Sequence, residues 1–558
     1  MKASYKFLLA AALSAPLLTG CIEESVPTQY VLSNQLVGNS NAITAFANAM
    51  PAHMNVIATL GQEYHFDFGM PSLMQVRNVM TDDLHVRYAG GFDWFSSWAV
   101  ADDALGPNYL VCQYPWNYYY AHVLTTNNSI KAIDPETEIA LERYYLGASL
   151  ATRAATYLDM ARMWEVLPTA VNNGNSPEGN NILGLSCVII TDETSEGDMR
   201  NNPRAEHSVM FEFIKNDLER AIPYMTGYAR PTKTLPDVAV AKGLLARLYL
   251  WDASYQAEVK ADQAAANASY AKAAQYAREA ISESGATPLT REQWLSTTAG
   301  FNDINVSSWM WGGQYAAEDD AVVAGGIRTW TSFLSPEQDF GYAGSQCGAF
   351  PEIGASFYNR MHNDDWRKLA FVAPEGTPLS GQEPFLDPEF AATYFDGPYI
   401  AIKFRPGQGN MADPNVGAVV GYPMMRVEEM YFIEAEATAH QNPGNGLSLL
   451  KQFMTTYRYP TYNATVSGNA AVVDEIIFQK RIELWGEGQN FFDVKRLNMS
   501  VTRFYNGTNF EDNETYNTVG RPAWMNFCIV AQEENNNEAL VGYNTPSPAG
   551  IYKPLTND

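Results

Sequence analysis

The sequence predicts a mostly α-helical protein in which helices pack in pairs and support a second part made largely of loops. Three observations predict this fold class. Long segments before residue 288 repeat apolar residues at helical spacing, and two consecutive segments carry the small residues typical of closely packed helix pairs. Residues 289–421 lose this periodicity and become rich in Gly, Pro, Asn and aromatic residues.

The composition is that of a large globular protein. Of the 558 residues, 46% are hydrophobic and 18% are charged, so wholesale disorder is excluded and a large core can form. The 62 acidic residues outnumber the 36 basic ones, which gives a net charge of −26. Because so acidic a chain repels phosphate groups, nucleic acid is excluded as a partner and non-specific binding to anionic lipid is disfavoured.

The first twenty residues are predicted to be a signal peptide. A basic start precedes an apolar stretch, residues 7–18, that is too short to span a bilayer. The Leu-Thr-Gly-Cys that follows resembles the lipobox of bacterial lipoproteins, which implies cleavage before Cys21 and attachment of acyl chains such as palmitate to it. Residues 21–40 are polar and are interpreted as a lipid tether. A plain secretory signal with an incidental cysteine is the alternative.

Helical periodicity places the next elements in order. In residues 138–166, Leu146, Leu150 and Leu158 fall on one face, and Pro168 ends the run. The same reasoning applies to the other periodic segments. Helices are predicted at 116–133, 138–166, 208–225, 237–251 and 269–283, and further along the chain at 426–440, 446–457 and 473–485.

Two neighbouring helices resemble a tetratricopeptide repeat. Small residues recur in Ala241–Tyr249 and again in Tyr270–Ala280, where two helices would cross, and aromatic residues stand beside them. The repeats are divergent and show no strict period. The chain is therefore divided as follows: scaffold at residues 41–288 and 422–500, and a loop-rich region facing ligand or partner at 289–421 and 501–558.

Aromatic residues in glycine-rich stretches are the predicted ligand-binding residues. Flat rings match the apolar faces of sugars, while Asn, Gln, Asp and Arg bind the hydroxyl groups at the rim. Two stretches, 87–109 and 307–348, have this composition. Trp309 and Trp311 alternate around Met310, which leaves open an extended segment with both indoles in the core. The predicted ligand-binding residues are Trp94, Trp98, Tyr109, Trp311, Trp330 and Tyr342.

The chain carries no recognisable catalytic or metal-binding motif. It has no GxSxG, HExxH or GxxxxGK[ST], and no GxGxxG that opens a helix. No enzymatic activity, cofactor or metal site is therefore predicted, and His362–Asp365 is interpreted as a solvated loop rather than a hard-cation site. Cys112, Cys187, Cys347 and Cys528 show no CxxC spacing, and disulfides and buried thiols remain alternatives for them.

Acidic residues crowd the C-terminal helices. Because buried carboxylates need cationic partners, we expect structural pairing with Arg426, Arg481 and Arg496. A hydrolase site built from paired carboxylates is the alternative, but nothing in the sequence fixes two of them at a defined separation. The acids concerned are Glu428, Glu434, Glu436, Glu483, Glu487 and Asp493.

Several segments together resemble the SusD/RagB family of outer-membrane nutrient-binding lipoproteins. Each match is weak alone, but the matches occur in family order. The sequence departs from the family pattern at Lys480–Arg481 and Gln489–Asn490, and its spacing in residues 170–200 is loose. The matching segments are Leu150–Tyr157 with Met163–Pro168, Phe213–Ile222, Ala241–Tyr249, Asp364–Arg367, Pro423–Ala437, and Ile482–Gly488 with Phe492–Arg496.

This resemblance carries expectations about fold and function. It implies a curved scaffold of about four tetratricopeptide-like helix pairs in a lipid-anchored protein of the outer membrane, exposed at the cell surface. Such a protein captures an oligomeric nutrient and closes as a lid over a SusC-like, TonB-dependent barrel. An oligosaccharide is the first choice of ligand and a peptide the second, since RagB-like members take peptides. A surface glycan hydrolase and a helical scaffold without ligand are the rival interpretations.

Overall fold

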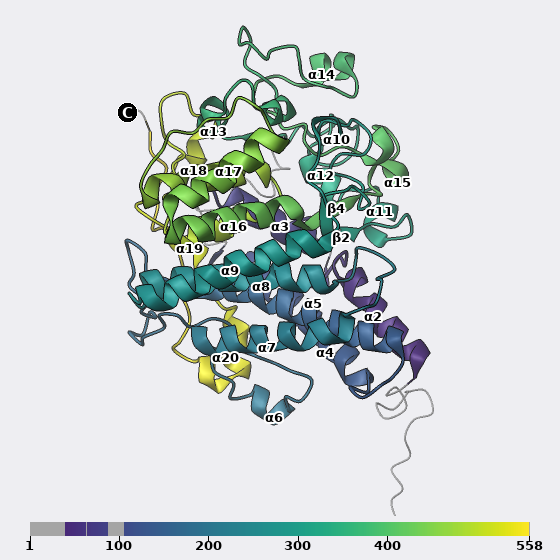
Figure 1. Cartoon of the computed structure of the whole chain (residues 1–558), viewed down its shortest axis with the longest axis vertical. Coiled ribbons are helices and arrows are strands. Elements are labelled where there is room, and N and C mark those ends of the chain that lie inside the picture. Colours follow the sequence, from purple (N-terminus) through teal and green to yellow (C-terminus); the bar gives the residue numbers. More distant parts are fainter. Residues whose placement is uncertain (1–38, 63, 88–104, 557–558) are drawn as a thin grey trace, which may run out of the picture.

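The structure, a computed structural model, describes residues 39–62, 64–87 and 105–556 (Figure 1). The long helices make up the scaffold. They are α2 (Ser40–His53), α3 (Met70–Val79), α4 (Leu110–Ala132), α5 (Ala140–Trp164), α7 (His207–Met225), α8 (Val238–Glu258), α9 (Gln263–Ser284), α16 (Val427–Gln441), α17 (Pro443–Tyr457) and α18 (Asn469–Glu483).

Short helices and strands connect and flank the long ones. The short helices are α6 (Glu196–Met199), α10 (Arg291–Trp294), α11 (Asp320–Val323), α12 (Trp330–Leu334), α13 (Ala355–Arg360), α14 (Pro388–Tyr394), α15 (Pro414–Gly417), α19 (Asn490–Arg496) and α20 (Ala531–Asn536). The strands are β1 (Leu84–Val86), β2 (Trp309–Gln314), β3 (Pro351–Ile353) and β4 (Gly421–Arg426), which form the antiparallel pairs β1–β3 and β2–β4.

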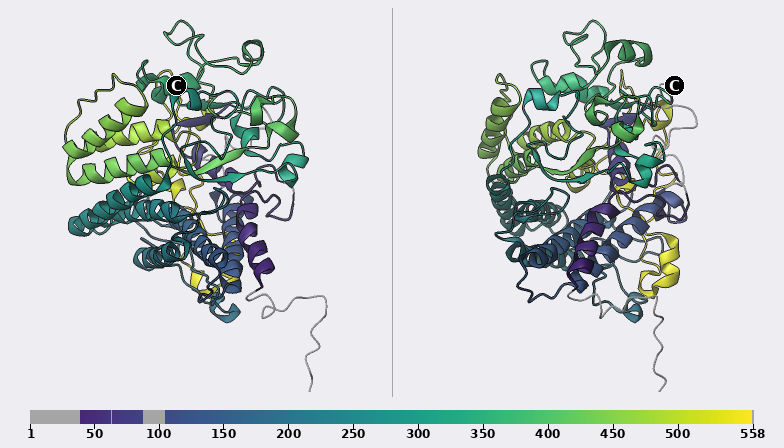
Figure 2. Two further views of the ribbon diagram at one scale, coloured as in Figure 1. Left: turned by 45° about the vertical axis from the view of Figure 1, so that its right-hand side comes forward. Right: turned by 90° about the vertical axis from the view of Figure 1, so that its right-hand side faces the viewer.

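The long helices stack on one another across the molecule. The helices α2 and α4, α5 and α7, α8 and α9, and α16 and α17 pack as pairs, and α9 also packs on α16. Figures 1 and 2 show the stack rising from α4 and α7 at the base through α8 and α9 to α16 and α17. The predicted fold class, a helical scaffold of tetratricopeptide-like pairs, is confirmed.

Small residues allow the close approach of paired helices. Along α9, the buried residues include Ala266, Ala273, Ala277 and Ala280, which follow the helical repeat. A Cβ atom at Gly147 of α5 would lie 2.5 Å from Cγ of Met225 in α7, so the backbones meet where no side chain fits. Small residues at helical spacing therefore both predict the helix pairs from the sequence and allow them to pack closely in the structure.

The predicted helices differ from the observed ones mainly at their ends. The run at 138–166 is α5, and the run at 208–225 is α7. The helix predicted at 237–251 continues to Glu258, because the apolar stripe ends before the helix does. None of the helices that the structure describes is both long enough and apolar enough to cross a membrane.

Most of the acids of the C-terminal helices form a buried ionic network, as predicted. Glu483 is fully buried and contacts three guanidinium groups, those of Arg458 at 2.6 Å, Arg367 at 3.0 Å and Arg426 at 3.2 Å. Arg496 binds Glu436 at 2.6 Å. These pairs join β4, α16, α18 and α19 to the loop-rich region, which indicates a scaffold role for the carboxylates.

The remaining acids and arginines have different partners. Arg481 of α18 pairs with Asp82 and Asp83, which are far away in the sequence, and not with an acid of the C-terminal helices. Glu434 binds Arg278 at the surface of α9. The four described cysteines are free thiols, three of them buried: Cys112, Cys187, Cys347 and Cys528.

Candidate functional site

Three of the predicted ligand-binding rings lie in the core. Trp311 is 3% exposed, Trp330 1% and Tyr342 3%, so none of them offers a face to a ligand in this structure. Their placement corrects the expectation that the glycine-rich stretch is an exposed loop. Tyr109, in contrast, is 44% exposed at the start of α4. Trp94 and Trp98 lie outside the described residues.

Long-range pairing explains the burial of these rings. Trp311 lies in β2, which pairs with β4 more than a hundred residues later, and its indole N–H donates to the carbonyl of Thr234 at 3.1 Å. The Trp330 ring meets that of Phe404 edge to face at 5.1 Å. Tyr342 stacks on Phe333 at 4.9 Å. For Trp309 and Trp311, the alternative of an extended segment with both indoles buried is confirmed.

The base of the molecule has an extended groove, here called the basal groove. It follows residues 181–206 and is walled by α4, the start of α7 and residues 531–543. Three hollows of about 610, 650 and 580 Å³ lie along it, and the smallest shares lining residues with each of the other two, so the three are neighbours. The shared residues are Ile189, Thr191, Thr194 and Asn202.

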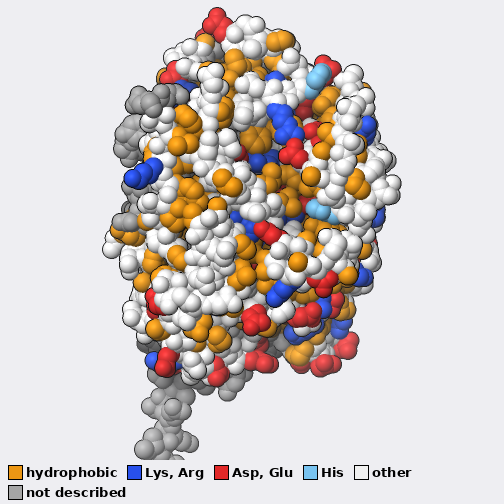
Figure 3. All heavy atoms as spheres, turned by 90° about the vertical axis from the view of Figure 1, so that its left-hand side faces the viewer, with side chains coloured by type: hydrophobic (Ala, Val, Ile, Leu, Met, Phe, Trp, Pro, Cys, Tyr) orange, Lys and Arg blue, Asp and Glu red, His pale blue; other side chains and the backbone are white. Residues whose placement is uncertain are grey.

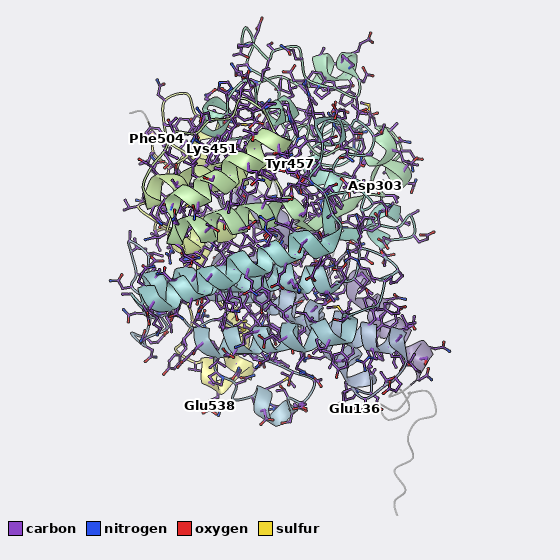
Figure 4. All side chains as sticks on the ribbon, viewed as in Figure 1. Glu136, Asp303, Lys451, Tyr457, Phe504 and Glu538 are labelled. Carbon is purple, nitrogen blue, oxygen red and sulfur yellow. The ribbon has the colours of Figure 1, made fainter. Side chains whose placement is uncertain are left out.

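The parts of this groove come from distant regions of the chain. In Figure 1, α6 and α20 lie together at the base, below α7. The N–H of Glu538 donates to the carbonyl of Arg200 at 2.8 Å, which ties the C-terminal segment to the end of α6. Figure 4 labels Glu538 at this position. The N–H of Ala531, the first residue of α20, donates to the carbonyl of Pro107. Pro107 precedes the exposed Tyr109 by two residues, so the start of α20 lies near Tyr109.

Arg204 fixes the floor of the basal groove. Its guanidinium is buried and donates to the carbonyls of Ser186 at 2.6 Å, Trp164 at 2.8 Å and Tyr543 at 2.9 Å. Burial lowers the pKa of Arg204 to about 10, so it remains charged at neutral pH. One arginine therefore joins the 181–206 segment to α5 and holds the backbone of Tyr543 at the rim.

Arg153 fixes the polar wall beside α4. Its guanidinium is buried and binds both carboxylate oxygens of Asp217, at 2.7 and 2.9 Å. It also donates to Oδ1 of Asn127 at 2.9 Å and to Oδ1 of Asp192 at 2.8 Å. Asn127 and Asp192 line the groove, so Arg153 sets the orientation of two ligand-facing groups from behind.

The groove offers rings, amides and charged groups. The charged residues that line it are Lys131, Asp192, Glu193, Asp198, Arg204, Glu206 and Glu533. Tyr543 is 40% exposed, and the hydroxyl of the partly buried Tyr120 donates to the carbonyl of Val188 at 2.8 Å. Burial raises the pKa of the Glu533 carboxyl, although the N–H of Trp116 opposes the shift. Carboxamide side chains line the groove beside these charged groups. They belong to Asn117, Asn127, Asn128, Asn181 and Asn202.

This combination suits an oligomer with apolar faces and many hydroxyl groups. Rings pack against C–H faces, and carboxamides both donate to and accept from hydroxyls. Three neighbouring hollows in a row match several linked units better than a single small molecule. Within the described ranges, no cluster of three or more His, Cys, Asp or Glu side chains is arranged to hold a metal ion.

Comparison with protein-family models finds one match, which covers the C-terminal part of the chain. Residues 389–555 match the SusD family. The matched segment contains the predicted motifs at Pro423–Ala437 and Ile482–Arg496, and the resemblance inferred from the sequence is confirmed there. No curated protein matches the sequence.

Solved structures of SusD-like proteins share the fold along almost the whole chain. A SusD-like carbohydrate-binding protein from Bacteroides vulgatus has a TM-score of 0.67 and 18% identity, covering 92% of this chain and 99% of its own. A SusD superfamily protein from Bacteroides thetaiotaomicron has a TM-score of 0.63 and 16% identity, covering 91% and 99%. A laminarin-binding SusD-like protein has a TM-score of 0.61 and 15% identity, covering 90% and 98%.

The basal groove was not predicted from the sequence. The signal for it was present, because residues 170–206 are aperiodic, rich in Asn, and loosely spaced relative to the SusD family pattern. Its second wall, residues 531–543, falls in the loop-rich region predicted at 501–558 to face ligand or partner, whereas residues 181–206 fall in the predicted scaffold. Nothing local in either segment indicates that the two meet.

Proposed function

We propose that this protein captures an oligomeric glycan and that the basal groove holds it. The observation that carries the proposal is the row of three neighbouring hollows, in which buried arginines position an amide and an exposed tyrosine. The SusD-family match supports the same role, since solved structures of this fold include a carbohydrate-binding and a laminarin-binding protein. Binding, not catalysis, is the proposed activity.

Removal of the Tyr543 ring should weaken glycan binding and leave stability unchanged. An exposed ring that packs against a sugar contributes on the scale of an interface anchor, about 1–3 kcal/mol. Tyr543→Ala should therefore lower the affinity for the best-binding oligosaccharide roughly five- to hundredfold. The measurement is calorimetric titration with laminarin oligosaccharides and other neutral glycans, together with a melting curve.

Tyr394 of α14 provides a matched control, because it is 43% exposed and lies away from the groove. Tyr394→Ala should leave the affinity unchanged. Equal affinities of wild type and Tyr543→Ala would argue against the basal groove as the glycan site. If the protein binds peptides but no glycan, the ligand is a peptide. If it cleaves a bound glycan, the hydrolase interpretation is favoured.

Lipid anchoring is the second part of the proposed function. Cys21 lies outside the described residues, and its proposed acylation rests on the sequence. Cys21→Ser removes the thiol to which the lipid attaches, so the variant should move from the detergent phase to the aqueous phase in a partition assay. Retention in the detergent phase would contradict the lipoprotein assignment.

We further propose that the base faces a SusC-like, TonB-dependent barrel, to which the captured glycan is delivered. Exposed aliphatic side chains border the groove there, as expected of a protein-binding surface. The barrel should co-purify in mild detergent from membranes at native expression levels. Isolation of this protein alone under those conditions would contradict the complex. The exposed side chains are Leu124, Met199, Val209 and Val541.

A further inference from the structure

A second pocket, separate from the basal groove, opens at the ends of the scaffold helices. It lies where α8 ends and α9 begins, beside the C-terminus of α16, the start of α18 and the end of α19, and its volume is about 610 Å³. Figure 3 looks onto these helix ends and shows a hollow with acidic and basic side chains on its walls. The pocket shares no lining residue with the basal groove.

A stacked pair of rings forms part of the pocket wall. The imidazole of His440 and the phenol of Tyr270 are nearly parallel, at 8°, with centroids 4.0 Å apart. Burial raises the pKa of Tyr270 to about 12, so its hydroxyl stays protonated and neutral at physiological pH. Tyr270 is 2% exposed and holds the imidazole of His440 in place from behind. His440 is partly exposed, so its imidazole is the ring of the stack that a ligand can contact.

The charged groups of the pocket are already paired. Arg496 binds Glu436 at 2.6 Å and Asp493 at 2.7 Å, and its Nη1 also donates to the hydroxyl of Ser254. Glu258, at the mouth, pairs with Arg521. Because each charge has an opposite partner, an ionic ligand would gain little from the pocket, and the pocket favours a neutral one.

Carboxamides make up the rim. They supply donors and acceptors without charge, which matches hydroxyl groups that also donate and accept. Two of them are held in place: Asn469 donates to the carbonyl of Ala439 at 3.1 Å, and Gln263 donates to Oδ1 of Asn267 at 2.9 Å. The rim amides are Gln263, Asn267, Gln441, Asn469 and Asn498.

We propose that this pocket is a second binding site, specific for a short neutral saccharide. Its volume lies within the range of small-molecule sites, and it is closed on one side by the Tyr270–His440 stack and Arg496. The site extends the proposed glycan capture to a second position on the protein, but it rests on different residues. It can therefore exist whether or not the basal groove binds glycan.

The test is calorimetric titration of the full-length protein with cellobiose, maltose and laminaribiose, and with digalacturonic acid as the charged counterpart. At least one neutral disaccharide should bind, and more tightly than the charged one. His440→Ala, which removes the stacked imidazole, should weaken that binding roughly five- to hundredfold. Asn267→Ala and Gln441→Ala, at exposed rim positions, should each weaken it about two- to tenfold.

Two controls separate this site from the basal groove. Gln275→Ala changes an exposed amide of α9 outside the pocket and should leave the affinity unchanged. Tyr543→Ala should also leave disaccharide binding unchanged. The proposal is overturned if no neutral disaccharide binds at millimolar concentration, or if binding survives the rim variants and His440→Ala. Disaccharide binding lost only in Tyr543→Ala would place the ligand in the basal groove and support the proposed function alone.

Discussion

Glu483→Gln should destabilise the protein by about 3–5 kcal/mol, the scale seen when one partner of a buried ion pair is removed. The carboxylate is fully buried and receives hydrogen bonds from Arg458 at 2.6 and 2.7 Å, from Arg367 at 3.0 Å and from Arg426 at 3.2 Å. Glutamine keeps the shape of the side chain but leaves these three guanidinium groups short of negative charge. The free energy of unfolding, from chemical denaturation followed by circular dichroism, measures the loss.

An exposed ion pair serves as the control for this substitution. Glu196 binds Arg200 at 2.7 Å, and both side chains are mostly exposed. Solvent and salt screen such a pair, so Glu196→Gln should cost less than about 1 kcal/mol. If Glu483→Gln costs no more than this control, the three arginines do not depend on Glu483 and the network is not a stabilising element.

The same carboxylate predicts how stability depends on pH. Burial alone would raise the pKa of Glu483, but the guanidinium groups of Arg458, Arg426 and Arg367 outweigh it and hold the pKa well below the ordinary value of 4.5. Because the pKa is lower in the folded state, the stabilisation is present above pH 4.5 and is lost as the pH falls below it. The acid-induced loss of stability should therefore be smaller in Glu483→Gln than in wild type.

The scaffold could be predicted because its signals are local. A helix such as α7 buries one face along its whole length, so the apolar repeat is visible in a window of a few turns. The short helices α11 and α12, with four and five residues, contain too few turns to show a repeat. The family motifs add order along the chain, which periodicity alone does not supply.

The sequence departs from the family pattern at Lys480–Arg481 and Gln489–Asn490. These departures do not change the predicted fold, but the sequence does not show which residues they contact. Lys480 binds Asp493 at 2.8 Å, and the next residue, Arg481, pairs with Asp82 and Asp83. The amide of Asn490, near the position where the family has an arginine, donates to the carbonyl of Arg481 at 3.0 Å. Only the packed structure shows that the partners of Arg481 come from the N-terminal segment.

The ligand-facing surfaces could not be predicted, because exposure depends on distant pairing. A glycine-rich stretch is exposed only if no other segment covers it, and β2 is covered by β4. The basal groove shows the reverse case, since its walls, residues 181–206 and 531–543, are far apart in the sequence. Of the predicted rings that the structure describes, Tyr109 alone is exposed, and it remains a candidate for ligand contact.

Trp330 was predicted to bind ligand but is buried in the structure, so its replacement tests directly whether it belongs to the core. Its ring is 1% exposed and packs against Phe404 at 5.1 Å and Tyr422 at 5.8 Å. Trp330→Ala should cost about 3–5 kcal/mol of stability, since it removes a large buried ring and leaves a cavity. The melting temperature should fall clearly, whereas glycan affinity, measured below the melting range, should stay at the wild-type value.

The comparison with Tyr543→Ala makes the outcome decisive, because the two variants should behave in opposite ways. A core ring changes the melt and not the affinity, and a ring at the ligand surface changes the affinity and not the melt. Trp330→Phe, which keeps an aromatic ring, should recover most of the lost stability, because the cavity that remains is smaller. An unchanged melt with weakened glycan binding in Trp330→Ala would instead mean that the ring reaches the ligand, and that this part of the core opens when glycan binds.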